Sequence, residues 1–348
     1  MRVATTIPMD DWRAIAPAVE LAEAAGYDGV MTNELAHDPF LPLPLAALAS
    51  KRVELATAIA VAFPRSPMTV AYQAWDLHAQ SGGRFQLGIG TQVKGHNERR
   101  FSTPWTAPVP RIREYVESLR AIWRCWEAGE KLDYRGEHYQ FTLMTPEFSP
   151  PPTGLAPPPI LLAALGPAML KLAGRVADGV RLHSFNTRKY MEEVTLKRVA
   201  EGLALAGRDR ASFEVVGGGF IATGGNADAV AERFEWARYR VAFYGSTRTY
   251  LPVFAVHGLE ELGSKLHALS VAGKWNEMAA EIPDDVVRLF TAVGTYDAIG
   301  AEIEQMFAGA SDTVRLDLSP GTDVGIHREV VQEVQRIPSP FTGHKAAA

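Results

Sequence analysis

Four titratable side chains are candidates for general acid or base chemistry near neutral pH: Glu34, His37, His96 and His183. An unperturbed histidine titrates at about 6.5, and burial can bring a carboxylate toward the same range. All four directly follow segments with the composition of strands, so a parallel sheet would gather them at one edge. Each alone is more often an ordinary polar group of a loop, whereas the set predicts at least one functional member.

Other kinds of site have weaker support. The histidines lack paired ligand spacing such as H-E-x-x-H, so we predict no metal site. No G-x-S-x-G motif is present, and the single cysteine, Cys125, lies in a helical run where a packed thiol is the default. The segment 94–100 combines cations with a glycine and is either a phosphate or carboxylate site or a solvated loop. A competing phosphate site is 223–226, after the seventh predicted strand.

Composition and charge describe a folded protein and argue against nucleic-acid and membrane partners. The chain has 348 residues, of which 47% are hydrophobic and 22% are charged. A net charge of −5 without a long basic block argues against a nucleic-acid partner. The longest uncharged stretch, 148–170, has six prolines between positions 150 and 159 and does not predict a membrane span. With one cysteine and no apolar run at its start, the chain is expected to be cytoplasmic.

Eight apolar segments alternate with segments of helical period, which is typical of β/α units around a parallel sheet. The expected strands are 2–7, 28–33, 53–62, 85–91, 159–164, 178–184, 213–222 and 313–318. This pattern predicts an α/β fold, a (β/α)₈ TIM-type barrel. We expect one domain over residues 1–348, with insertions at about 93–107, 129–158 and 244–292. An open doubly wound sheet is the rival, but its G-x-G-x-x-G fingerprint is missing.

One motif connects the chain with a known family. The sequence S-G-G-R-F-Q-L-G-I-G at 81–90 closely resembles the luciferase-like monooxygenase superfamily, and the resemblance continues at 164–169, 172–180 and 243–247. It covers nearly the whole chain. Segments 38–43, 90–94 and 98–101 are most similar to the branch of probable deazaflavin (coenzyme F-420)-dependent oxidoreductases.

The resemblance implies a bacterial-luciferase-like barrel that binds a flavin or deazaflavin at its C-terminal mouth. It implies a non-proline cis peptide at Ala58-Ile59 in a bulge of the third strand, and it places the cofactor phosphate near the loops after strands four and five. The cofactor-binding residues that it implies are Ala58, Ile59, Gly90, Thr91, Gln92, Arg99, Arg100, Ala164, Leu165, Gly166 and His183. Glu34 and His37 would lie near the reactive edge of the ring, with His96 as a further catalytic candidate. Deazaflavin sugar-phosphate dehydrogenases have an adjacent Asp-His pair where this chain has Asn33-Glu34, so the resemblance does not extend to their substrate.

The resulting hypothesis is an oxidoreductase that transfers a hydride between coenzyme F-420 and a small, mostly apolar organic substrate. Lys94, Arg99 and Arg100 favour the deazaflavin, because only that cofactor has a polyglutamate tail for a basic loop to bind. One alternative is an FMN-dependent monooxygenase that uses oxygen and reduced flavin from a reductase partner, and another is a non-catalytic flavin-binding relative. We expect a substrate pocket lined by Phe63, Trp105, Phe148 and residues of the 244–292 insertion. We also expect a homodimer in which this insertion contacts the second subunit.

Overall fold

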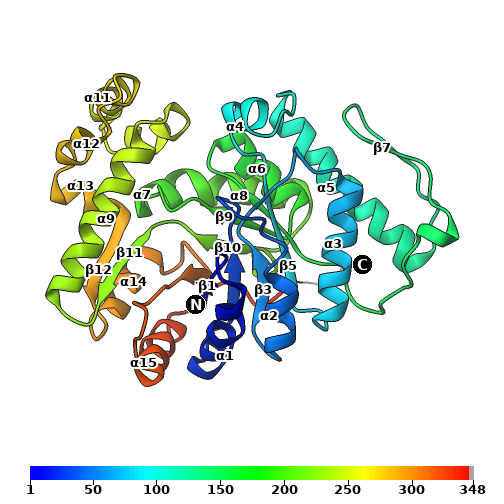
Figure 1. Ribbon diagram of the computed structural model, residues 1–348. Helices are drawn as coiled ribbons and strands as arrows, with labels where there is room; N and C mark the ends of the chain where they lie inside the picture. Colours follow the sequence, from blue (N-terminus) through cyan, green and yellow to red (C-terminus); the bar gives the residue numbers. More distant parts are fainter. Residues whose placement is uncertain (345–348) are drawn as a thin grey trace.

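The computed structural model describes residues 1–344, and its centre is a closed barrel of eight parallel strands (Figure 1). In order around the barrel these are β1 (Arg2–Thr6), β2 (Gly29–Thr32), β3 (Glu54–Thr57), β5 (Phe85–Gly90), β8 (Ile160–Ala163), β9 (Gly179–Leu182), β10 (Glu214–Gly217) and β13 (Thr313–Arg315). Parallel pairing of β1 with β13 and of β3 with β5 closes the ring. The predicted (β/α)₈ barrel is confirmed.

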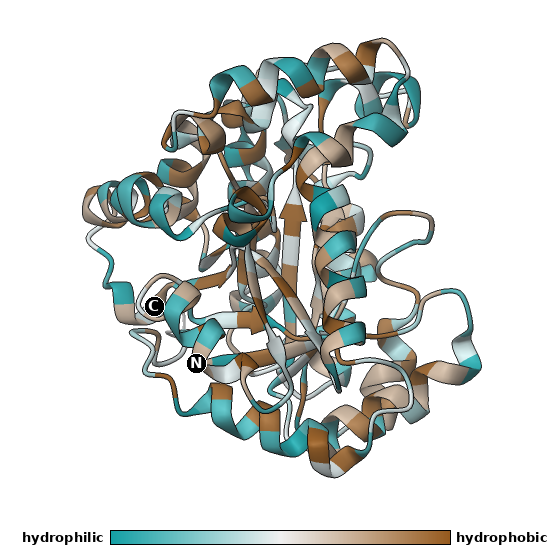
Figure 2. Ribbon diagram, turned by 90° about the vertical axis from the view of Figure 1, so that its left-hand side faces the viewer, coloured by the Kyte–Doolittle hydropathy of each residue, from teal (hydrophilic) through white to brown (hydrophobic). Residues whose placement is uncertain are grey.

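Helices surround the barrel and cover its strands. The outer ring contains α1 (Ile15–Ala25), α2 (Leu43–Ala49), α3 (Pro67–Gln80), α5 (Pro108–Ala128), α6 (Pro167–Val176), α8 (Leu196–Leu205), α14 (Ile299–Phe307) and α15 (Val324–Gln335). Short signals in the sequence determine several helix ends: the Ser66 side chain accepts a hydrogen bond from the Met68 amide before α3, and Gly26 ends α1 with a φ of 89°. In Figure 2 the central strands are mainly brown or pale, whereas the helices carry teal on their outer sides. The hydrophobic core therefore lies between the strands and the helices.

The third barrel strand is interrupted where the cofactor site is expected. β3 ends at Thr57, and the strand resumes as β4 (Ala60–Val61). Ala56 pairs with Gln86 and Ala60 with Ile89, so the third strand has one residue more than β5 between these pairs, which is a β-bulge. The Ala58-Ile59 peptide inside the bulge is cis.

Beside this bulge, a threonine side chain makes the hydrogen bonds to β5 that the backbone of a regular strand would make. Thr57 Oγ1 accepts from the Gly88 amide at 2.9 Å and donates to the Gly88 carbonyl at 2.7 Å, and the side chain is fully buried. Gly88 has no space for a side chain, because a Cβ there would lie 2.0 Å from the Thr57 carbonyl oxygen. Thr57 and Gly88 thus hold the bulge against β5.

We expect Thr57→Val to lower the free energy of unfolding by about 1–3 kcal/mol, because valine has a similar shape and leaves both polar groups of Gly88 buried without a partner. Urea unfolding of the wild type and the variant measures the change. Thr106→Val, at an exposed loop position, is the matched control. Equal stability of the Thr57 and Thr106 variants would contradict the role given to the Thr57 hydroxyl.

The seventh predicted strand, 213–222, is in fact two strands, so that prediction is wrong. β10 stays in the barrel, while β11 (Phe220–Gly224) leaves it and pairs in parallel with β12 (Thr291–Thr295), a strand that the sequence did not indicate. Gly217 and Gly218 make the break with φ values of 83° and 115°. A Cβ on Gly218 would lie 2.3 Å from the Met191 sulfur, so both backbone conformation and space require glycine there.

The three long segments have secondary structure of their own. Residues 93–107 contain α4 (Lys94–Arg99), and residues 129–158 contain the hairpin β6 (Tyr134–Arg135) and β7 (Gln140–Phe141). The segment 244–292 contains α10 (Leu251–Ala255), α11 (Glu260–Val271), α12 (Trp275–Met278) and α13 (Asp284–Phe290). These helices pack with α9 (Ala227–Gly245) around a second hydrophobic cluster beside the barrel (Figure 1). Within residues 1–344, no helix is long and apolar enough to cross a membrane.

Candidate functional site at the barrel mouth

The C-terminal ends of the barrel strands form the mouth where catalytic groups of such barrels lie. Part of its surface, here called the mouth floor, is made by the small or aliphatic residues Ala58, Ile59, Gly90 and Ala163. A Cβ on Gly90 would lie 2.9 Å from the Ala163 Cβ and 3.0 Å from the Ile59 Cδ1, so Ile59, Gly90 and Ala163 lie close together and only glycine fits at position 90. Ala58 and Ile59 are both half-buried. The mouth floor is therefore an apolar surface without long side chains, which suits the face of a planar ring.

Glu34 lies at the end of β2, but its carboxylate is already bound. Oε2 accepts from the Val61 amide at 2.7 Å, and Arg65 Nη1 contacts Oε1 at 3.0 Å and Oε2 at 2.8 Å. Arg65 also reaches Asp38 at 2.8 Å. Only 5% of the Glu34 side chain and 17% of the Arg65 side chain are exposed. The geometry thus gives Glu34 a positioning role: it attaches the end of β2 to the strand that resumes after the bulge.

The other two residues predicted as catalytic have exposed side chains. His37 lies in the loop after β2 and His96 on α4, and neither side chain has a hydrogen bond to residues 1–344. The two loops meet nearby, because the Arg100 guanidinium donates to the Leu35 carbonyl. The structure therefore brings the loops of His37 and His96 together but fixes neither imidazole.

The loop after β5 is held in an unusual conformation. Gln92 has a φ of 56°, which is uncommon for a residue with a side chain. Asn97 is fully buried and donates to the carbonyls of Thr91 at 2.8 Å and Val93 at 3.2 Å, so it anchors the turn from below. The predicted cofactor residues Gly90, Thr91 and Gln92 are thus a rigid unit. The basic side chains that follow, Lys94, Arg99 and Arg100, are exposed.

The loop after β8 leads into the free N-terminus of α6. Ala164 is buried, Leu165 is half-buried, and Gly166 is the residue before the helix. No side chain caps this end, and Pro167 occupies the first helical position. The first amides of α6 therefore remain available to an anion.

His183 follows β9 and is the histidine most firmly fixed at the mouth. Its Nδ1 accepts from the Phe185 amide at 2.9 Å, and its ring packs against Tyr244 at 4.3 Å and Tyr250 at 4.9 Å between centroids. Burial, assisted by the charges of Arg315 and Arg240, lowers the pKa of His183 to about 4. At neutral pH the imidazole is uncharged, and because Nδ1 is an acceptor, Nε2 carries the proton. His183 thus presents a neutral hydrogen-bond donor.

The lowered pKa of His183 predicts a pH dependence of stability. Between about pH 4 and 6.5 the unfolded chain binds a proton at this residue that the folded protein does not, so stability rises with pH across this window. The slope of the unfolding free energy against pH is proportional to the number of protons that the unfolded state binds beyond the folded state. We expect His183→Phe to lower this number by about one in the same pH window. Urea unfolding at several pH values measures this slope, with His37→Phe as the control. An unchanged slope in the His183 variant would contradict the neutral state of the imidazole.

The aromatic residues predicted for the substrate pocket are only partly brought together. Phe63 is buried and packs edge-on against half-buried Trp105 at 6.0 Å, with the Arg111 guanidinium 4.3 Å from the Phe63 ring. Phe148 does not join them: 68% of it is exposed, and its carbonyl accepts a hydrogen bond from Tyr72 of α3.

Several residues at the mouth were not predicted. They are Arg65, which pairs with Glu34, and Arg315 and Asp317 at the end of β13. Tyr244 and Tyr250 lie within the predicted 244–292 insertion, but their packing on His183 was not predicted. The position of Arg315 and Asp317 at the end of the last predicted strand could have indicated them. The aromatic partners come from α9 and the helical insertion, and no local pattern connects them with β9.

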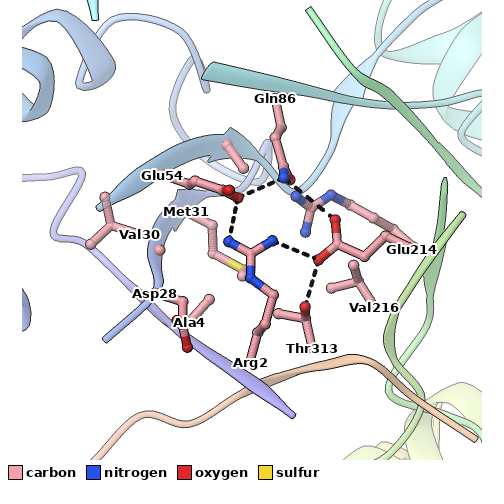
Figure 3. A pocket seen from close by; sticks show the side chains of 13 residues that line it. Arg2, Ala4, Asp28, Val30, Met31, Glu54, Gln86, Glu214, Val216 and Thr313 are labelled. Carbon is pink, nitrogen blue, oxygen red and sulfur yellow. Dashed lines mark hydrogen bonds and ion pairs between the residues drawn. The ribbon is translucent and has the colours of Figure 1, made fainter. Parts of the chain in front are cut away.

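A separate cluster of charged residues fills the opposite end of the barrel (Figure 3). Arg2 pairs with Glu54 at 2.7 Å and with Glu214 at 3.3 Å, and Gln86 donates to Glu54 at 2.6 Å. Burial raises the pKa of Glu54. For Glu214 burial acts in the same direction, but the hydrogen bond from His344 and the charge of Arg2 outweigh it and lower its pKa to about 2. This cluster surrounds a cavity of only about 20 Å³, and its place at the N-terminal end indicates a structural role.

Residues 1–344 contain no group of three or more histidine, cysteine, aspartate or glutamate side chains arranged to hold a metal ion. Cys125 is half-buried against the hydrophobic core, and burial raises the pKa of its thiol.

The chain is similar in sequence and in fold to several known proteins. The chain is 44% identical over 309 residues to an uncharacterised protein of Mycobacterium tuberculosis, covering 89% of this chain and 91% of that protein. It is 28% identical to a putative coenzyme F420-dependent oxidoreductase of the same organism, with 86% and 92% covered. The fold is similar to that of the coenzyme F420-dependent tetrahydromethanopterin reductase from Methanopyrus kandleri, with a TM-score of 0.77, 22% identity and 96% and 98% covered. The profile of luciferase-like monooxygenases matches residues 1–313, and the chain belongs to this family.

Proposed function

We propose that this protein is an oxidoreductase that transfers a hydride between coenzyme F-420 and a small organic substrate at the barrel mouth. The observation that carries the proposal is the mouth floor: Ala58, Ile59, Gly90 and Ala163 form an apolar surface where a planar ring can lie. The similarity to a putative F420-dependent oxidoreductase supports the choice of cofactor.

The remaining residues of the mouth suit the other parts of such a cofactor. The uncapped N-terminus of α6 and the rigid turn at Thr91 and Gln92 would hold its phosphate. Lys94, Arg99 and Arg100 are exposed cations that would hold an acidic tail. The deazaflavin, when bound, supplies two-electron hydride chemistry.

The protein would supply orientation and a hydrogen-bond donor. The Nε2 proton of His183 is available to a substrate oxygen on which negative charge develops. Glu34 holds the resumed strand in place through Val61. His37 and His96 remain proposed acid or base residues, because their loops border the mouth and their side chains can move.

An FMN-dependent monooxygenase is the second candidate, because the family takes its description from such enzymes and the mouth floor would accept either ring. The two functions differ in how much the exposed cations Lys94, Arg99 and Arg100 contribute to cofactor binding. FMN has no acidic tail, so Arg99 and Arg100 would add little to its binding.

The proposal is tested by fluorescence titration of the purified protein with oxidised F-420 and, in parallel, with FMN. We expect saturable binding of F-420 at a concentration where FMN does not bind. A preference for FMN would instead support the monooxygenase. Binding of neither compound would contradict both functions.

We expect Arg99→Ala and Arg100→Ala to weaken F-420 binding, and to weaken it more as the cofactor carries more glutamates, because each added carboxylate meets the exposed cations. Dissociation constants for F-420 species with short and long tails measure the effect. Arg124→Ala, an exposed arginine on α5 near its C-terminal end, is the control. If affinity does not depend on tail length in the wild type, the loop does not bind the tail.

A further inference from the structure

Arg315 is a charged side chain on the inner face of the barrel wall. Thr313, two residues earlier on the same strand, faces the barrel interior and donates to Glu214. Arg315 lies on the same side of β13 and pairs in register with Ala4, which also faces inward. Even so, 40% of the Arg315 side chain is exposed. The barrel is therefore open to solvent above this guanidinium.

One edge of the Arg315 guanidinium is fixed and the other is free. Nε lies 3.1 Å from Asp317 Oδ2. Asp317 is itself held by the Thr5 hydroxyl at 2.9 Å and by the Thr6 amide and hydroxyl at 2.9 and 3.0 Å. Within the described chain, the terminal nitrogens of Arg315 have no hydrogen-bond partner. Such a planar pair of donors matches a carboxylate, which can accept from both.

The pairing with Asp317 does not explain why a charge is placed here. Both side chains are more than one third exposed, and ion pairs of this kind contribute little to stability. The well-held aspartate does, however, orient the arginine. An oriented and unsaturated guanidinium at the mouth is the arrangement expected of a ligand-binding group.

A second arginine, Arg240, lies on α9, the helix whose Tyr244 packs on His183. Arg240 and Tyr244 are one turn apart on α9, so they share a helix face, and Tyr244 packs on the His183 ring. Arg240 lies 5.2 Å from the Trp236 ring centroid and has no carboxylate partner among residues 1–344. Burial lowers the pKa of His183, and the charges of Arg315 and Arg240 act in the same direction.

We propose that the substrate carries a carboxylate, which the free edge of Arg315 binds at the barrel mouth. This inference rests on the proposed function, because it names the class of substrate for the same site. It adds an acidic group to an otherwise apolar molecule whose body contacts Tyr244 and Tyr250.

The test compares two probes that differ only in charge, 3-phenylpropionate and 3-phenylpropanamide, by calorimetric titration of the protein loaded with F-420. In the wild type we expect the acid to bind at least about tenfold more tightly than the amide. Arg315→Gln should abolish this preference and leave the affinity for the amide unchanged. Arg315→Lys should retain part of the preference for the acid, because lysine keeps the positive charge but lacks the two parallel donors of a guanidinium. Arg198→Gln, on the outer helix α8, is the matched control and should behave as the wild type.

Equal binding of the two probes, binding of neither, or an unchanged preference in Arg315→Gln would each overturn the proposal. Failure of the proposed function is distinguishable, because F-420 binding is measured separately before the probes are added. If F-420 does not bind, the same comparison is made by thermal shift on the cofactor-free protein. A preference for the acid there would support the carboxylate site without the cofactor.

Discussion

Arg65→Met should lower the free energy of unfolding by about 3 kcal/mol or more, which is the largest effect on stability that we expect from a single substitution at the mouth. The arginine holds the carboxylate of Glu34, whose side chain is only 5% exposed. Without Arg65, the Val61 amide is the only hydrogen-bond donor among residues 1–344 that remains for the buried Glu34 carboxylate. Urea unfolding at neutral pH measures the loss.

The same interpretation predicts a recovery. Adding Glu34→Gln to Arg65→Met removes the unpaired charge, so the double variant should be more stable than Arg65→Met alone. Arg111→Met is the control. Arg111 packs over Phe63 and donates to Tyr139 and to the Pro104 carbonyl, and within the described residues it has no carboxylate partner. If the double variant is no more stable than the single one, the loss does not arise from the charge of Glu34.

His183→Phe should lower turnover by about 10²-fold and change the F-420 dissociation constant by no more than about threefold. Phenylalanine keeps a ring between Tyr244 and Tyr250 but has no Nε2 proton. The measurement requires an acceptor found by screening carbonyls and enones against reduced F-420. Cofactor affinity comes from the fluorescence titration.

A donor role for His183 also predicts partial rescue. His183→Gln supplies an amide donor in a similar place and should recover part of the turnover. His37→Ala and His96→Ala are parallel tests of the two exposed histidines. A larger loss at either of these than at His183 would transfer the catalytic role to that residue.

The barrel was predictable because its signals are local and repeated. Each strand is a short apolar run, each helix has its own period, and residues such as Ser66 and Gly26 mark helix ends within a few positions. The resemblance to the family located the bulge, and the cis peptide is found at the implied position, Ala58-Ile59.

The errors arise where distant segments decide the structure. The run 213–222 has the composition of one strand, and only the positive φ values of Gly217 and Gly218 divide it. β12 is a five-residue segment that becomes a strand by pairing with β11. Glu34 looked like a free carboxylate, because no spacing in the sequence reveals that Arg65 binds it. Residues of a site are thus easier to locate than their partners.

The pairing of β1 with β13 has a consequence for synthesis of the chain. Arg2 pairs with Thr313, so the first strand leaves the ribosome roughly 300 residues before its second neighbour. At typical elongation rates this delay is on the order of tens of seconds. During that time one edge of β1 has no strand to complete its hydrogen bonds, and such an edge can pair with other chains. Nascent chains of this protein should therefore depend on chaperones until the final strand emerges.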